Sequence, residues 1–240
     1  MAALLATACA MSAEAPVETS LTCSEGTAAP ASDQARPEVV FLGSSSAAGH
    51  GASTRSTSYA WRLSEALSAT RPTACGVNLA RGGYTTWHLR PGSLGLRTGR
   101  PQVDTLRNID AALARAPRLV VLHLPSNDPA LRLPLEESLG NINAIITQAT
   151  NAGVRLLVVG AQPRPLSGDT GLLLRRWARA LDTLSTAETV DVWGNLALDS
   201  TRMKPGFVAP DGIHLNDSGH AVVYRQVLRS RTWRELFGTP

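Results

Sequence analysis

The sequence is nearly free of lysine and poor in aromatic residues. Lysine occurs once, at Lys204, so almost all of the 23 basic residues are arginines, and the net charge is +4. A nucleic-acid-binding protein usually carries a dense basic stripe with interleaved aromatic side chains. Here the arginines are scattered and aromatic residues make up 5% of the chain, so we expect no nucleic-acid partner. The modest cluster at Arg225, Arg229, Arg231 and Arg234 is interpreted as a solvated helix face.

The sequence also lacks a long apolar run and any pattern of metal ligands. No stretch approaches the ~20 apolar residues that a transmembrane helix needs, so we expect no membrane span. No paired Cys-x-x-Cys occurs and no histidine is spaced to complete a zinc site, so neither a metal nor a cofactor is expected. With 240 residues, 43% hydrophobic and 18% charged, the chain has the composition of one folded domain with a sizeable core.

Residues 1–11 form a signal-like or lipobox-like segment. They are almost wholly apolar and small: Leu4–Cys9 resembles a bacterial lipobox with Cys9 as the candidate lipid anchor, and Ala6–Ala8 suits an ordinary signal peptidase. A signal normally begins with basic residues, yet none precedes Arg36. Three interpretations therefore stay open: a lipoprotein, a secreted protein, or a cytoplasmic protein with an N-terminal tail. Of these we expect export, whether periplasmic, lipid-anchored or secreted.

Residues 12–36 are rich in Ala, Ser, Glu, Thr and Pro without hydrophobic periodicity, which predicts a flexible linker before a domain at 37–240. Whether the cysteines form a disulfide depends on the cellular compartment of the protein. If Cys9 carries lipid or is removed, Cys23 and Cys75 remain as an even pair. In an exported protein this pair can form a disulfide, whereas in the cytosol both would be thiols.

The domain alternates between apolar β-type runs and segments with helical periodicity. The strands are predicted at 39–42, 77–80, 119–124, 154–159 and 190–193. The helices are predicted around 59–67, 101–114, 135–149, 173–184 and 221–237. Continuous apolar strands that alternate with helices indicate a parallel sheet covered on both faces.

Polar segments follow the first three predicted strands. They are Gly43–Ser46, Asn78–Thr85 and Ser126–Asp128, and a fourth polar segment, Asp211–His214, precedes the last predicted helix. In an open α/β sheet, ligands bind outside the carboxyl ends of the strands. The first three segments are therefore expected to meet at one site. Each segment alone has an ordinary interpretation as a loop, turn or helix cap, and only their conjunction points to chemistry.

The four segments together supply the groups for acyl hydrolysis. A serine hydroxyl is a weak nucleophile unless a base removes its proton, and His214 can do this for Ser45. Asp211, three residues before His214, can hold the imidazole in the tautomer that accepts the proton. The amide of Asn127 and the backbone N–H group of Gly83 can donate to a developing oxyanion.

Other residues near these segments receive weaker interpretations. His50 and His220 have no partner at a useful sequence spacing, and His123 is interpreted as a core histidine in a buried strand. The run Trp87–Leu89 either lines an acyl or leaving-group pocket or packs in the core.

The four segments, in this order, resemble the blocks of the SGNH, or GDSL, hydrolase superfamily. Gly43–Ser46 stands at its Gly-Asp-Ser-Leu block, Asn78–Thr85 at the block with the oxyanion glycine, Ser126–Asp128 at Gly-x-Asn-Asp, and Asp211–His214 at the final Asp-x-x-His. The resemblance spans about residues 37–236. It implies a catalytic Ser45, Asp211 and His214, an oxyanion hole of Ser45, Gly83 and Asn127, and no metal.

The resemblance also implies a flavodoxin-like, three-layer α/β/α sandwich with a five-stranded parallel sheet. In two places the sequence departs from the family pattern: Ser44 replaces the usual aspartate, which the family tolerates, and Pro125 replaces the glycine before Asn127. Neither change removes a group that the reaction needs.

On these grounds we expect a metal-independent serine ester hydrolase that cleaves short-acyl carboxylic esters through an acyl-serine intermediate. The acyl group is expected to be short because the connections around the motifs contain no long apolar lid. Two alternatives stay open. One is a carbohydrate or cell-envelope O-acetylesterase, and the other is a non-catalytic sugar- or lipid-binding module with the same fold. The partner is accordingly a small-molecule or glycan ester.

Overall fold

The computed structural model describes residues 19–20, 37–124, 126–184 and 186–238 of the chain. The signal-like segment, Cys9, Cys23 and Pro125 lie outside these ranges. Within them, no helix is both long enough and apolar enough to cross a membrane.

Five parallel strands form the centre of the fold, as predicted, in the order β3-β2-β4-β5-β6. The strands are β2 (Pro37–Gly43), β3 (Cys75–Asn78), β4 (Leu119–His123), β5 (Arg155–Val159) and β6 (Glu188–Val190). In chain order this is 2-1-3-4-5, the flavodoxin-like arrangement. A two-residue strand, β1 (Thr19–Ser20), pairs antiparallel with β3 at the edge, inside the range predicted as linker.

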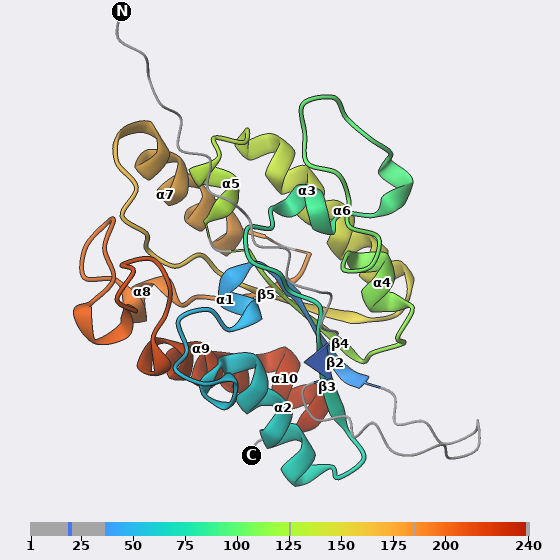
Figure 1. Cartoon of the computed structure of the whole chain (residues 1–240). Helices are drawn as coiled ribbons and strands as arrows, with labels where there is room; N and C mark the ends of the chain where they lie inside the picture. Colours follow the sequence, from blue (N-terminus) through green and yellow to red (C-terminus); the bar gives the residue numbers. More distant parts are fainter. Residues whose placement is uncertain (1–18, 21–36, 125, 185, 239–240) are drawn as a thin grey trace, which may run out of the picture.

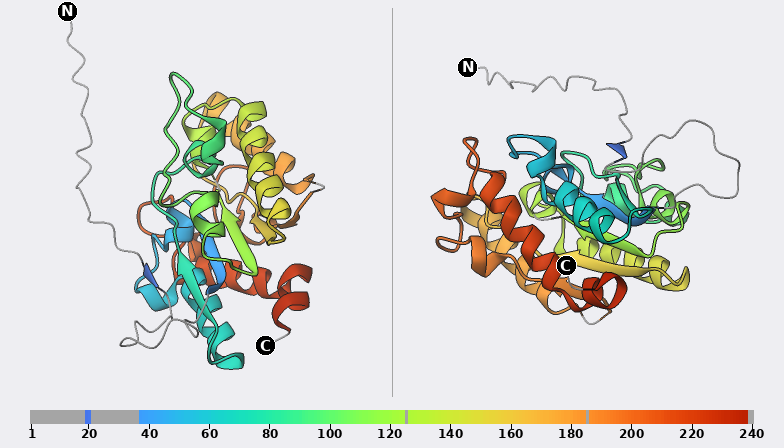
Figure 2. Two further views of the ribbon diagram at one scale, coloured as in Figure 1. Left: turned by 90° about the vertical axis from the view of Figure 1, so that its right-hand side faces the viewer. Right: turned by 90° about the horizontal axis from the view of Figure 1, so that it is seen from below.

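Helices cover both faces of the sheet and make it the middle of three layers (Figure 1). One face carries α2 (Tyr59–Thr70), α9 (Asp217–Arg229) and α10 (Arg231–Phe237). The other carries α4 (Ile109–Leu113), α6 (Leu135–Asn151) and α7 (Gly168–Asp182). Seen from below, α2 and α9 lie side by side over their face of the sheet (Figure 2).

Short elements complete the connections between the strands and the long helices. They are the helices α1 (Ser45–Ala48), α3 (Thr86–Leu89), α5 (Asn127–Ala130) and α8 (Trp193–Leu196), with 3-10 turns η1 (Arg55–Thr57), η2 (Gly92–Leu94) and η3 (Pro205–Phe207).

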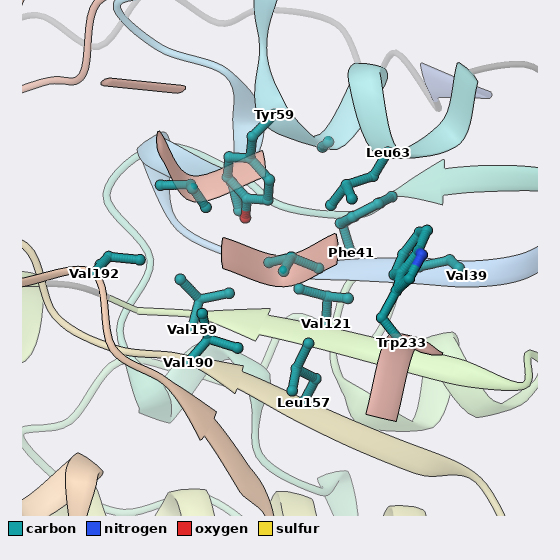
Figure 3. Close-up of a cluster of buried hydrophobic side chains, with 14 of the residues drawn as sticks. Val39, Phe41, Tyr59, Leu63, Val121, Leu157, Val159, Val190, Val192 and Trp233 are labelled. Atoms are coloured by element: carbon teal, nitrogen blue, oxygen red, sulfur yellow. The ribbon is translucent and has the colours of Figure 1, made fainter. Parts of the chain in front are cut away.

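Alternate side chains of each strand enter two separate cores. Val39 and Phe41 of β2 pack towards α2, α9 and α10, whereas Val40 and Leu42 pack towards α6 and α7. Figure 3 shows the first core, where Phe41 faces the helix α2. The central strands β2 and β4 are nearly continuous apolar runs because both of their faces are buried, whereas β6 at the edge is Glu-Thr-Val and buries only Val190.

Two predicted helices differ from the structure. Only Ile109–Leu113 of the range 101–114 is helical, because Asn108 caps the helix by accepting a hydrogen bond from the Ala111 N–H at 3.0 Å. The predicted closing helix is divided into α9 and α10 at Ser230. The Ser230 backbone is extended, with ψ 148°, and its hydroxyl accepts from the Trp233 N–H at 3.2 Å to start α10.

Two histidines are fully buried between the sheet and α9. His123 ends β4, and its ring lies 5.6 Å from the ring of Tyr59. His220 accepts a hydrogen bond from the Tyr59 N–H at its Nδ1 and donates from Nε2 to the carbonyl of His50, 3.1 Å away. His220 therefore has long-range partners that its sequence spacing did not reveal. Burial lowers the pKa of His220 to about 4 and that of His123 to about 3.

We expect acid to destabilise the fold through these histidines. Because their pKa values are lowered by folding, the unfolded chain binds protons more readily, and stability falls as the pH drops from the unfolded value of ~6.5 towards the folded value. For His220 the loss between pH 7 and pH 4 is about 3 kcal/mol. Urea unfolding at pH 7, 5.5 and 4 measures it. His220→Gln should flatten the pH profile, and equal slopes for variant and parent would contradict this account.

Candidate active site

The predicted site segments meet at the carboxyl edge of the sheet. Ser45 begins α1 directly after β2, Gly83 lies in the loop after β3, and Asn127 begins α5 after β4. These residues and His214 border one cavity of about 230 Å³. The lining comprises Ser45, Ser46, His50, Gly82, Gly83, Ser126, Asn127, Gln162, Arg164, Ile213 and His214.

The turn that presents Ser45 depends on Gly43 at the end of β2. A Cβ atom at Gly43 would lie 2.2 Å from the carbonyl oxygen of His123 on β4, and the residue has a φ of 152°. That same His123 carbonyl accepts the Ser44 N–H at 3.1 Å. Only glycine permits this approach, and the approach directs the chain into α1 with Ser45 half-buried at its first position.

Asp211 and His214 form a hydrogen-bonded pair. The ring Nδ1 of His214 donates to Asp211 Oδ2 at 2.5 Å, and Asp211 Oδ1 accepts the backbone N–H groups of His214 at 3.0 Å and Ile213 at 2.9 Å. Burial raises the pKa of Asp211, but the hydrogen bonds from His214 and Ile213 outweigh it and lower that pKa to about 2. Asp211 is therefore a carboxylate at neutral pH, which directs the Nδ1 proton and leaves Nε2 as the proton acceptor.

The loop that carries His214 packs against the loop after α1. A Cβ atom at Gly51, whose φ is 86°, would lie 2.3 Å from the carbonyl oxygen of Leu215 and 2.8 Å from His214 Cβ. The ring of His50 lies 5.4 Å from the ring of His214. His50 therefore borders the cavity, which corrects its interpretation as a residue without a partner.

Side-chain hydrogen bonds connect the turn at Ser45 to the loop that carries His214. The Ser46 hydroxyl donates to Gln162 Oε1 at 3.0 Å, and Gln162 Nε2 donates to the carbonyl of Ile213 at 3.1 Å. Although Ser45 and His214 line the same cavity, their side chains share no hydrogen bond within the described part of the chain. Such contacts are often long in unliganded sites and tighten when substrate binds.

The amide of Asn127 is held at both ends. Its Nδ2 donates to the Tyr84 carbonyl at 2.9 Å, and its Oδ1 accepts from Arg164 Nη1 at 3.2 Å. Gly83 precedes Tyr84 with a φ of 83°, a left-handed conformation that favours glycine. This places the backbone of Gly83 beside Asn127 on the cavity wall.

A second contact joins the segment that contains Gly83 to the segment that contains Asn127. The buried carboxyl of Asp128 accepts the Thr86 hydroxyl at 2.6 Å and the Thr86 N–H at 3.1 Å. Burial raises the pKa of Asp128, and the hydrogen bonds from Thr86 oppose that rise. The donors expected from Gly83 and Asn127 are thus positioned relative to each other by polar side chains outside the cavity lining.

Three lining residues were missed by the sequence patterns: His50, Gln162 and Arg164. Each lies outside the four motifs and reaches the cavity only because the chain folds back on itself. Trp87 and Leu89, in contrast, are buried in the core and do not line the cavity, so the packing interpretation holds for them. In the described ranges no three His, Cys, Asp or Glu side chains gather as metal ligands would.

Comparisons with known proteins agree with this geometry. Residues 41–222 match the GDSL-like Lipase/Acylhydrolase family. The structure of TesA is similar, with a TM-score of 0.61 and 20% identity over 82% of this chain and 98% of TesA. The psychrotrophic esterase EstA from Pseudoalteromonas sp. has a TM-score of 0.57 and 17% identity over 79% of this chain and 93% of EstA.

A two-domain esterase (CEX) active on acetylated mannans is also similar, with a TM-score of 0.54 and 20% identity over 85% of this chain and 51% of that esterase. At these identities, the likeness to solved structures shows a shared fold. No curated protein sequence matches the chain.

We expect Gly51→Ala to displace His214. The added Cβ would meet backbone at 2.3 Å, so the histidine loop must move, and stability should fall by about 1–3 kcal/mol. Thermal unfolding and the rate at which Ser45 reacts with an alkyl fluorophosphonate measure both effects. Gly140→Ala is the control, because that helical glycine has no atom within 4 Å of its Cβ position. Unchanged Ser45 reactivity in a folded Gly51→Ala protein would contradict the role of this contact.

Proposed function

This chain belongs to the GDSL-like Lipase/Acylhydrolase family, and we propose that within it the chain acts as a metal-independent serine ester hydrolase on short-acyl esters. The family and the esterase neighbours support an acylhydrolase activity in general. The observation that carries the finer proposal is the ordered Asp211–His214 pair on the same cavity as Ser45 and Asn127.

In the proposed reaction, Ser45 Oγ attacks the ester carbonyl carbon while His214 Nε2 takes its proton. The Asp211 carboxylate keeps the His214 ring oriented and stabilises the imidazolium that forms. The backbone N–H groups of Ser45 and Gly83 and the amide of Asn127 donate to the tetrahedral oxyanion. The imidazolium then protonates the leaving alcohol, and water attacks the acyl-serine by the same route to release the acid.

The size and lining of the cavity support a short acyl group. The cavity holds about 230 Å³, and among the described residues that line it Ile213 alone has an aliphatic side chain. The remaining lining consists of glycine backbone, hydroxyls, amides, imidazoles and a guanidinium. Pockets for long acyl chains are lined mostly by apolar side chains. An acetyl group therefore suits this cavity better than a fatty acyl chain.

The polar lining also favours a second candidate, a carbohydrate or cell-envelope O-acetylesterase. Hydroxyls, amides and a guanidinium are groups that hydrogen-bond sugar hydroxyls, and they surround the candidate nucleophile on several sides. The similar esterase CEX is active on acetylated mannans, which makes acetylated glycans the first polymers to test. A non-catalytic sugar- or lipid-binding module is the remaining alternative, and it predicts binding without turnover.

We expect Ser45→Ala to abolish ester hydrolysis and leave the fold intact. Removal of the nucleophile should lower kcat by about 10³-fold or more, because only binding and the oxyanion donors remain. The assay is p-nitrophenyl acetate turnover with circular dichroism as the folding check, and covalent labelling by a fluorophosphonate should be lost as well. Ser68→Ala is a matched control, since that hydroxyl lies on α2 away from the cavity. Near-normal turnover by folded Ser45→Ala would refute a serine mechanism.

We expect activity to fall with acyl length. For p-nitrophenyl esters, kcat/KM should be highest for acetate or butyrate and drop about tenfold or more by octanoate, since a cavity of about 230 Å³ offers little apolar burial to a long chain. Acetate release from acetylated mannan or xylan, measured in parallel, distinguishes the glycan esterase from a general esterase. A preference for octanoate would exclude both.

We further propose that the protein is exported. The support is that Cys75 is disulfide-bonded, and disulfides persist mainly in oxidising compartments. The two other cysteines of the chain, Cys9 and Cys23, lie outside the described residues. Of these we propose Cys23, because Ser20 of β1, three residues before Cys23, stands opposite Val77 of β3, two residues after Cys75.

Peptide mapping of unreduced protein should recover Cys23 and Cys75 as one cross-linked peptide. The protein should be taken from the periplasm or the medium of an expressing bacterium, without thiols in the buffers. Reduction should separate the two peptides. Alkylation of both Cys23 and Cys75 before reduction would disprove the bridge and remove this support for export.

A further inference from the structure

Among the described residues that line the cavity, Arg164 alone carries a guanidinium. It lies beyond the carboxyl end of β5 and is half-buried. Its Nη1 donates to Asn127 Oδ1 at 3.2 Å and to the Ser126 hydroxyl at 3.4 Å. Within the described ranges no carboxylate forms an ion pair with it, although Asp211 is near enough to raise its pKa against the lowering effect of burial. A half-buried charge is costly without a pair, which points to a function for Arg164 at this site.

The hydrogen bonds of Asn127 with Arg164 and with the Tyr84 carbonyl both require the same orientation of the Asn127 amide. A guanidinium can only donate, so the atom that faces Arg164 must be Oδ1. A backbone carbonyl can only accept, so the atom that faces Tyr84 must be Nδ2. The rotated amide would lose both hydrogen bonds and turn its oxygen towards the oxyanion position. With the amide held in this way, the second N–H of Nδ2 remains for a ligand in the cavity.

The charge of Arg164 also strengthens that second N–H. A guanidinium bound to Oδ1 draws electron density through the amide and makes its N–H groups better donors, because hydrogen bonds in series polarise one another. The gain is largest when the acceptor carries negative charge, which occurs in the tetrahedral transition state and not in the neutral ester. The effect should therefore appear in kcat and much less in KM.

We propose that Arg164 is a positioning residue that orients and polarises the Asn127 amide for oxyanion stabilisation. This proposal rests on the proposed function. The hydrogen bonds from Arg164 to Asn127 and Ser126 make the segment after β5 part of the oxyanion site, beside the segments after β2, β3 and β4. The alternative role for Arg164, direct binding of an anionic group on the substrate, would appear in KM.

A double-mutant cycle tests the proposal. Arg164→Leu removes both the donor and the charge, and Arg164→Gln keeps a donor without the charge; each is made alone and with Asn127→Ala. The control is Arg71→Leu, because Arg71 is likewise half-buried but donates to the Leu236 carbonyl, at 3.1 Å, outside the cavity. The readouts are kcat and KM for p-nitrophenyl acetate and the rate of inactivation by a fluorophosphonate, with thermal unfolding as the check on folding.

We expect Asn127→Ala to lower kcat about 10²–10³-fold and Arg164→Leu about 10–100-fold, both with little change in KM. Arg164→Gln should fall between Arg164→Leu and the parent. In the Asn127→Ala background, Arg164→Leu should cost less than about threefold, because its effect passes through the missing amide. Inactivation by the fluorophosphonate should slow in parallel with kcat, and Arg71→Leu should match the parent.

Three results would overturn the proposal. Fully additive losses in the double mutant would show that Arg164 does not act through Asn127. A raised KM with unchanged kcat in Arg164→Leu would show that Arg164 binds substrate directly. An unaltered kcat in Asn127→Ala would remove the amide from the oxyanion site. All three leave the serine mechanism in place, whereas an active, folded Ser45→Ala protein would refute that mechanism and with it the proposed function.

Discussion

The close approach of β2 and β4 at the carboxyl edge of the sheet is the constraint on which the rest of the site depends. In the parallel register Gly43 stands opposite His123, and a side chain at that glycine would overlap the His123 carbonyl. The contact ends β2 and turns the chain into α1, so that Ser45 emerges at the sheet edge. The same parallel register sends the segments after β3, β4 and β5 to that edge, which is why residues far apart in the chain line one cavity.

The parallel strands bring the loops to the same edge of the sheet, and hydrogen bonds from polar side chains fix the positions of these loops relative to one another. The carboxyl of Asp217 at the start of α9 accepts the Ser53 N–H at 2.7 Å and the Thr57 hydroxyl at 2.7 Å, which holds the loop after α1 against the last helix pair. Asp128 does the same between the segments after β3 and β4. These carboxyl groups lie outside the cavity lining, and their hydrogen bonds hold together the loops that carry the lining residues.

The chemistry of the cavity wall narrows the range of ligands more than the fold does. Folds of this class host many functions, so the argument for short, polar esters rests on the local wall of hydroxyls, amides and the Arg164 guanidinium. The buried histidines His123 and His220 lie behind this wall in their neutral forms. Both rings pack against Tyr59, and their burial links the stability of this part of the fold to pH.

The sequence by itself determined the fold class, the five parallel strands and the segments that reach the site. These features depend on local physics: apolar runs of strand length, helical periodicity, and short polar motifs at the ends of strands. It also identified Ser45, Gly83, Asn127, Asp211 and His214 as the candidate site, since the order of the four motifs is itself in the sequence.

Only the tertiary structure decided which further residues join them. His50, Gln162 and Arg164 carry no motif, and each acquires its place through contacts with segments distant in the chain. Tertiary contacts likewise decided where the helices end: a cap at Asn108 and an extended residue at Ser230 replaced longer predicted helices. The physical reason is the same in each case. Periodicity and motif spacing reflect interactions between residues that are close in the chain. Hydrogen-bond partners and cavity walls depend instead on elements that are distant in the chain and meet only once the sheet has formed.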